Sequence, residues 1–96
     1  MNKRVELDGL IITVHEMTVG EVRAWQHAVE TEGEVDALSH MLMDGLRIPD
    51  LYWMSDLTAD KAEQLRPSEI RRIEAAAREL NPDFFTMLAR IFPAAS

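Results

Sequence analysis

The side chains best suited to chemistry in this sequence are its 3 histidines, His15, His27 and His40. Each lies in a different predicted element, and none belongs to the H-x-x-x-H or E-x-x-H spacing that brings two ligands to one helix face. The sequence contains no cysteine, so thiolate metal sites and disulfide bonds are both excluded. Because metal ligands occur in clusters, we expect no metal site and no cofactor.

Motifs for catalysis and for nucleic-acid binding are also missing. The sequence has no G-x-S-x-G, no glycine-rich phosphate loop and no paired carboxylates, so we expect no catalytic residues and no enzymatic activity. Its densest basic group is interleaved with acidic residues along one segment: Arg66, Glu69, Arg71, Arg72, Glu74, Arg78 and Glu79. Glu74 and Arg78 have the i,i+4 spacing of a stabilising ion pair. This pattern indicates a solvated, self-neutralised helix face and not a phosphate-binding surface.

Length, composition and charge narrow the class of protein. The 96 residues, 47% apolar and 28% charged, are typical of one globular domain spanning residues 1–96. No run approaches the roughly 18 apolar residues of a membrane helix, and the start MNKRVELDG lacks the apolar stretch of a secretory signal. A net charge of −7 would repel nucleic acid and anionic membranes. We therefore expect a cytoplasmic protein that binds neither.

The stretch Leu80–Phe92 carries more large apolar side chains than one buried helix face requires. Asn81 is expected to cap this helix and Pro82 to occupy its first position. At helical spacing the apolar residues form two adjacent stripes, Phe84, Met87, Leu88 and Ile91 beside Phe85, Leu88 and Phe92. Such a helix either lies at the centre of the core or docks on another molecule, and the sequence leaves both alternatives open.

A second group of bulky side chains follows Pro49 and Asp50, where we expect Asp50 to cap a helix of one or two turns. Methionines in and near this group suit a surface that repacks around varied apolar partners, although methionine is also an ordinary core residue. The candidate surface for self-association and for an apolar partner combines both regions: Tyr52, Trp53, Met54, Phe84, Phe85, Met87, Leu88, Ile91 and Phe92.

The elements that would position these residues begin with a β-hairpin. Apolar and polar residues alternate on both sides of Asp8-Gly9, a dipeptide typical of a type I′ turn with positive φ at both positions. A two-residue turn predicts the pairs Leu7 with Leu10, Val5 with Ile12, and Lys3 with Val14. The apolar face must then pack on the helices, because a lone hairpin is marginal in water, while the outer edges stay open to another strand.

Helical signals fill the rest of the chain. Thr18-Val19-Gly20-Glu21 is a capping box that opens a helix to about Glu30, with Val22, Trp25, Ala28 and Val29 facing inward. Further helices are expected over residues 34–46, 58–65, 67–80 and 82–92, and Thr58 is expected to cap the second of these. The sequence therefore predicts a mainly α (α+β) fold, in which a hairpin at residues 3–15 packs on a bundle of four to five helices within residues 18–92.

The order of these features resembles the tail assembly chaperones of long-tailed bacteriophages. The resemblance rests on Leu7-Asp8-Gly9 in the hairpin, on Thr18-Val19-Gly20-Glu21 and on the stretch from Gly45 to Leu57, and it covers about Val5 to Phe92. The chain departs from many members in lacking a longer polar N-terminal lead, and Arg71-Arg72 to Glu79 is unusually charged.

The resemblance implies a function. Chaperones of this kind bind the apolar, largely helical tape-measure protein before the tail tube protein polymerises around it, and they are absent from the mature virion. Members often occur as a short form and a frameshifted longer form that recruits tube protein, and this chain would be the short form. The resemblance thus places the protein in the cytoplasm of the host bacterium, with the tape-measure protein and the tail tube protein as partners.

Two other classes of function remain open from the sequence. An acidic inhibitor that mimics nucleic acid would gather its carboxylates on one face, whereas here they are spread through every predicted element. A regulatory subunit of an unrelated complex is the remaining alternative, and it would use the same apolar residues for a different partner.

Overall fold

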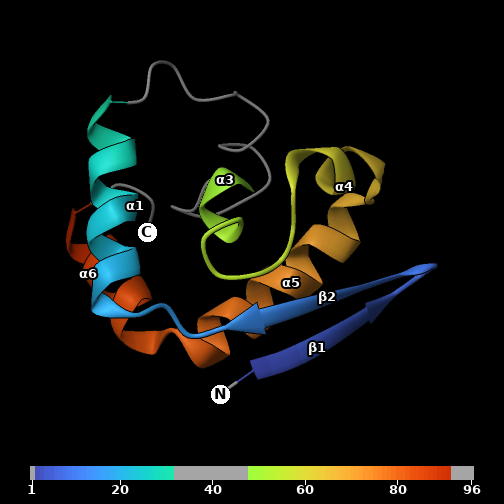
Figure 1. The fold of residues 1–96 in the computed structure, drawn as a ribbon. Coiled ribbons are helices and arrows are strands. Elements are labelled where there is room, and N and C mark those ends of the chain that lie inside the picture. The colour runs from blue at the N-terminus through green and yellow to red at the C-terminus, as the bar shows by residue number, and fades with distance from the viewer. Residues whose placement is uncertain (1, 32–47, 92–96) are drawn as a thin grey trace.

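The computed structural model describes residues 2–31 and 48–91 and shows an N-terminal hairpin followed by five helices (Figure 1). The elements are β1 (Asn2–Leu7), β2 (Leu10–His15), α1 (Val19–Thr31), α3 (Ile48–Leu51), α4 (Ala59–Gln64), α5 (Pro67–Leu80) and α6 (Pro82–Ile91). The expected mainly α fold with an N-terminal hairpin is confirmed. The helix expected over residues 34–46 lies outside the described residues.

The hairpin has the predicted register but a different turn. Leu7 pairs with Leu10, Val5 with Ile12 and Lys3 with Val14, so the apolar face follows from the alternation. Gly9 has φ 76°, whereas no residue other than glycine in the described part has a positive φ, which excludes a type I′ turn. A side chain at Asp8 would make the left-handed conformation costly, so only the residue without a Cβ adopts it, as at the second central position of a type II turn.

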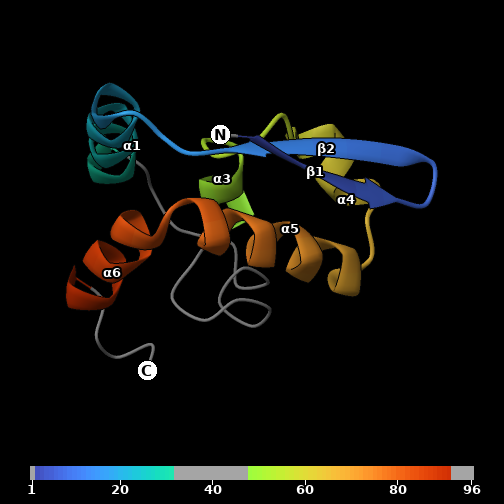
Figure 2. The same cartoon turned by 90° about the horizontal axis from the view of Figure 1, so that it is seen from below.

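Helix α5 is the central element on which the hairpin lies. Figure 2 shows it running beneath both strands, and it contacts β1, β2, α3 and α6. The shared core is apolar and almost fully buried, and its members from the hairpin and α5 are Val5, Leu7, Ile12, Val14, Ile70, Ile73, Ala76 and Ala77. Three- and four-residue spacing brings the α5 residues to one face, and two-residue spacing does the same in the strands.

The outer edge of β2 is covered by the segment between α3 and α4, which differs from the expected open edge. Val14 forms an isolated antiparallel bridge with Ser55, and the His15 N–H donates to the Met54 carbonyl oxygen at 2.8 Å. Asp56 completes the pairing, since its N–H donates to the Thr13 carbonyl oxygen at 3.1 Å and its Oδ1 accepts from the Thr13 N–H at 2.9 Å. No described strand pairs with the outer edge of β1.

Helix α1 is held to the body through Trp25, which is 3% exposed. Its indole Nε1–H donates to Asp50 Oδ1 at 2.9 Å, and Asp50 is itself only 2% exposed. Asp50 was expected to cap a short helix, but it lies inside α3 and accepts the indole instead. A buried carboxylate needs a donor, so this hydrogen bond fixes the position of α1 relative to α3.

Asn81 joins the end of the hairpin to the α5–α6 corner. Its Oδ1 accepts from the Met17 N–H at 2.8 Å, while its Nδ2 donates to the carbonyl oxygens of His15 at 3.0 Å and Ala77 at 3.1 Å. The side chain therefore does not cap α6 as expected, because its polar atoms are already used by the linker before α1. The backbone carbonyl of Asn81 accepts from the Phe85 N–H at 3.1 Å instead.

The capping box at the start of α1 forms as the sequence predicts. The Glu21 carboxylate accepts from the Thr18 N–H at 3.0 Å, and Thr18 Oγ1 accepts from the Glu21 N–H at 3.1 Å. His15 Nε2 also lies 3.3 Å from the same carboxylate. The hydrogen bond from the Thr18 N–H, with a smaller contribution from His15, holds the pKa of Glu21 below its ordinary value.

This lowered pKa predicts an acid-dependent loss of stability. A carboxyl whose pKa is lower in the folded than in the unfolded state stabilises the fold above its unfolded pKa, and the contribution is lost as pH falls through the folded pKa. Glu21→Gln should therefore be less stable than the wild type at neutral pH, and this difference should disappear in strong acid. Urea denaturation over a pH series measures it. The control is Glu16→Gln, because Glu16 is exposed, and a difference for Glu21→Gln that does not change with pH would contradict the prediction.

Candidate functional site

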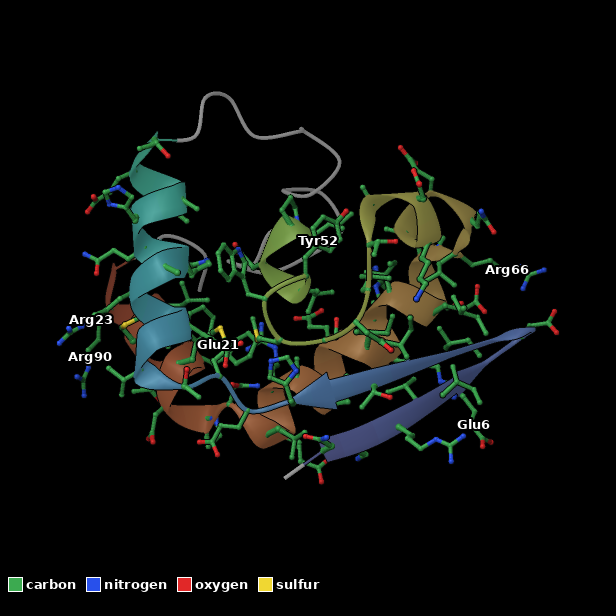
Figure 3. All side chains as sticks on the ribbon, viewed as in Figure 1. Glu6, Glu21, Arg23, Tyr52, Arg66 and Arg90 are labelled. Carbon is green, nitrogen blue, oxygen red and sulfur yellow. The ribbon has the colours of Figure 1, made fainter. Side chains whose placement is uncertain are left out.

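The structure places the expected site residues near α3 at different depths. Met54 is 0% exposed and belongs to the core, so it cannot contact a partner. Its backbone pairs with β2, which holds this residue between the hairpin and α3. Tyr52 and Trp53 are partly buried against the core, and Tyr52 lies near the middle of the molecule in Figure 3. Burial, with some help from Glu63, raises the pKa of Tyr52 above its ordinary value.

Helix α6 buries one central line instead of the two expected stripes. Phe84 and Leu88, which are one turn apart, are 6% and 5% exposed, while Phe85 and Met87 lie partly buried on either side of them. The Ile91 side chain and Phe92 lie outside the described residues. The face of α6 that carries Phe84 is buried because α1 covers it: Trp25 packs edge-on against Phe84 with ring centroids 4.9 Å apart.

Phe85 has neighbours on both sides and is not a free anchor for a partner. Its ring meets that of Phe84 edge-on at a centroid distance of 5.5 Å. The Arg78 guanidinium lies 4.5 Å above the Phe85 ring, which is a cation–π distance. Arg78 is in turn held by the Glu74 carboxylate at 2.9 Å, the i,i+4 pair that the sequence predicts.

A groove between the start of α1 and α6 is lined by several apolar side chains. Its volume is about 300 Å³, and we call it the α1–α6 groove, lined by Glu16, Met17, Val19, Val22, Arg23, Asn81, Asp83, Phe84 and Met87. Phe84 and Met17 are buried residues of the groove, Val22 and Met87 are partly exposed, and Val19 is 73% exposed. Phe84 and Met87 are the expected site residues that the fold brings to this groove.

Val19 and Met17 belong to the groove but were not expected there. The signal that could have indicated Val19 is its spacing, since Val19 and Val22 are one helical turn apart and share a face of α1. Val19 would then be an apolar side chain in addition to those that pack α1 against the core. Met17 carried no local signal, because it lies between β2 and α1 and is buried only through tertiary packing.

Charged residues surround this apolar groove without filling it. Glu16 and Asp83 supply carboxylates at the groove, and Arg23 supplies a guanidinium. In Figure 3, Arg23 of α1 and Arg90 of α6 project on the same side of the molecule. An apolar groove with a polar rim is suited to binding another protein, because the apolar centre supplies affinity and the charged rim supplies orientation.

Metal-binding clusters and membrane-spanning helices are both absent from the described residues. Residues 2–31 and 48–91 contain no group of three or more histidine, cysteine or acidic side chains placed to hold a metal ion. Within the same ranges, none of the helices combines the length and apolar character needed to cross a membrane.

The structure is that of a small α+β protein with an apolar groove that is lined in part by charged residues. No protein-family model, no curated protein and no solved structure matches the chain significantly.

Proposed function

We propose that this chain is a non-enzymatic phage tail assembly chaperone, and that its α1–α6 groove binds an apolar helix of the tape-measure protein. The observation that carries the proposal is the exposed Val19 beside the partly exposed Val22 and Met87, in a groove to which buried Phe84 contributes. Apolar surface in such a groove favours a partner that supplies apolar side chains. The resemblance described above supplies the class of that partner.

The groove favours a helical segment as its ligand. An amphipathic helix can lay side chains one turn apart into a groove between two helices, as in other helix-in-groove complexes. Glu16 and Asp83 favour a basic residue at the edge of the bound segment, and Arg23 favours an acidic one. A tape-measure segment with apolar residues at i, i+3 or i+4, and i+7 and with flanking charges would meet both requirements.

Groove binding of this kind is strong enough for a transient chaperone. Each large side chain that becomes buried contributes about 1.5 to 3 kcal/mol, and association itself costs several kcal/mol. Three such anchors would contribute about 4.5 to 9 kcal/mol before this cost is subtracted, so the complex would be weak and would dissociate readily. A chaperone must release its client, so this range suits binding before the tube protein polymerises around the tape-measure protein.

The tail tube protein is the second proposed partner, and the host cytoplasm is the proposed location. Release would hand the tape-measure protein to the tail tube protein, and the chaperone would act in the cytoplasm of the host bacterium without entering the mature virion. The apolar groove and the acidic charge support this role, because together they shield an aggregation-prone helix while keeping the complex soluble.

Val19→Asp tests the groove with little risk to the fold. Val19 is the first residue of α1 and is highly exposed, and a carboxylate there interacts favourably with the helix dipole. We expect the melting temperature to stay close to that of the wild type and the affinity for a purified tape-measure segment to fall about tenfold or more, because a charge replaces apolar contact. Isothermal titration calorimetry measures the affinity.

Ile11→Asp is the matched control, because Ile11 is also an exposed apolar residue, at 44%, but lies on the outer face of the hairpin. Its affinity for the same segment should equal that of the wild type. Unchanged binding by Val19→Asp would move the binding site away from the groove. Failure of the wild type to bind any segment of the tape-measure protein would overturn the proposed function.

A further inference from the structure

The outer edge of β1 presents backbone groups ready for another strand. In the hairpin ladder the pairs Lys3–Val14, Val5–Ile12 and Leu7–Leu10 direct their N–H and C=O groups toward each other, so those of Asn2, Arg4 and Glu6 point outward. The same alternation on β2 is visible in its pairing with residues 54–56 through Thr13 and His15. One edge of the hairpin is thus paired with residues 54–56, whereas no strand among the described residues pairs with the other edge.

A groove of about 490 Å³ follows this open edge between β1 and α5. Lys3, Arg4, Val5 and Glu6 line it from the strand, and Arg72, Ala75, Ala76 and Glu79 line it from the helix. The two sides are linked by an ion pair between Lys3 and Glu79. Arg72 Nη2 donates to the Glu6 carbonyl oxygen at 2.7 Å, which shows that this outward-facing acceptor is within reach of a donor.

We infer that the β1 edge pairs with β1 of a second copy of this chain, in an antiparallel arrangement whose twofold axis passes at Val5. This surface is distinct from the α1–α6 groove and does not depend on the proposed function. The pairing would join the two hairpins into one four-stranded sheet, in which Arg4 and Glu6 of each copy exchange backbone hydrogen bonds with Glu6 and Arg4 of the other.

Charge complementarity selects both the occupant and the register. Arg4 and Glu6 lie two residues apart on the polar face of β1, so a twofold axis at Val5 places each guanidinium directly opposite a carboxylate. Moving the axis to Lys3, Arg4 or Glu6 keeps the hydrogen-bond pattern but sets that side chain opposite its own copy. Like charges directly opposite each other destabilise a sheet.

The existing contacts of the edge permit this pairing. Val5 faces α5 and meets Val5 of the second copy on the apolar side of the sheet, while Glu6 projects away from the rest of the molecule (Figure 3). The Glu6 carbonyl oxygen has two lone pairs, so it can accept from the incoming Arg4 N–H beside Arg72 or in its place. Arg72 is exposed and can turn toward solvent.

Charge-swap variants test the register directly. Arg4→Glu should weaken dimerisation at least about tenfold, because two carboxylates then oppose two carboxylates. The double variant Arg4→Glu/Glu6→Arg should restore the dimer, and an equimolar mixture of Arg4→Glu with Glu6→Arg should form a heterodimer. Sedimentation equilibrium measures the dimer, and circular dichroism checks that each variant is folded. Both residues are exposed on the polar face, so the fold should tolerate the changes.

Amide exchange of the wild type provides a second readout that requires no substitution. The Arg4 and Glu6 amides should become protected as the protein concentration rises, whereas the Val5 amide, which bonds to β2, should be protected at every concentration. A wild type that stays monomeric up to about millimolar concentration would overturn the inference. A dimer whose Arg4 and Glu6 amides exchange freely, or a folded double variant that stays monomeric, would overturn it as well.

Discussion

Replacing Trp25 with alanine should lower the free energy of unfolding by about 3 to 5 kcal/mol, the range for truncating a buried aromatic residue. Trp25 is 3% exposed and packs edge-on against Phe84 across the boundary between α1 and α6. Its removal also takes the indole donor from the buried Asp50 carboxylate. Because Trp25 holds α1 in place, the same change should loosen the wall of the α1–α6 groove.

Trp25→Phe separates packing from hydrogen bonding. Phenylalanine keeps most of the ring contact with Phe84 but cannot donate to Asp50, so we expect a smaller loss of about 1 to 3 kcal/mol. Urea denaturation followed by far-ultraviolet circular dichroism measures the free energy of unfolding of both variants without relying on tryptophan fluorescence. A loss below about 0.5 kcal/mol for Trp25→Ala would show that the residue is not a core anchor.

Asn81→Leu is the second change with a large expected effect, about 2 to 5 kcal/mol. Leucine has a similar size but removes the three hydrogen bonds that Asn81 makes to Met17, His15 and Ala77. The Met17 N–H and the His15 carbonyl oxygen would then be left without these partners beside a residue that is only 3% exposed. An unpaired buried polar group destabilises the fold more than the hydrogen bond itself stabilises it.

Asn2→Leu is the matched control, because Asn2 and Asn81 are the two asparagines of the chain and Asn2 is exposed. It should change stability by less than about 0.5 kcal/mol. Amide exchange adds a local test. In Asn81→Leu the Met17 amide should lose more of its protection from exchange than the Ile12 amide does. Equal effects of the two substitutions would contradict the assigned role of Asn81.

Interactions between residues close in the sequence could be predicted from the sequence alone. The hairpin register follows from the two-residue turn and the alternation of apolar residues. The Thr18–Glu21 capping box and the Thr58 cap, whose Oγ1 accepts from the Lys61 N–H at 3.3 Å, follow from short-range spacing. The Glu74–Arg78 pair is also separated by one helical turn. Each of these contacts needs only the local backbone, so residue type and spacing suffice to determine it.

The tertiary structure decided which face of α6 is buried and therefore where the candidate site lies. Apolar periodicity indicated a helix with surplus apolar surface, but it could not show that Trp25 would cover Phe84 and leave Met87 in a groove with Val19. A pattern along one helix identifies its apolar faces without identifying the element that covers each face.

Buried polar residues and the sheet edges were likewise decided by contacts between distant segments. Asp50 and Asn81 both looked like helix caps, yet Asp50 meets Trp25 from 25 residues away and Asn81 meets Met17 from 64 residues away. Met54 was a candidate partner-binding residue with a core role left open, and the structure places its side chain in the core, where its backbone pairs with β2. Short polar side chains can bond to nearby backbone groups or to distant backbone and side-chain groups, so only the packed fold determines which partner each one takes.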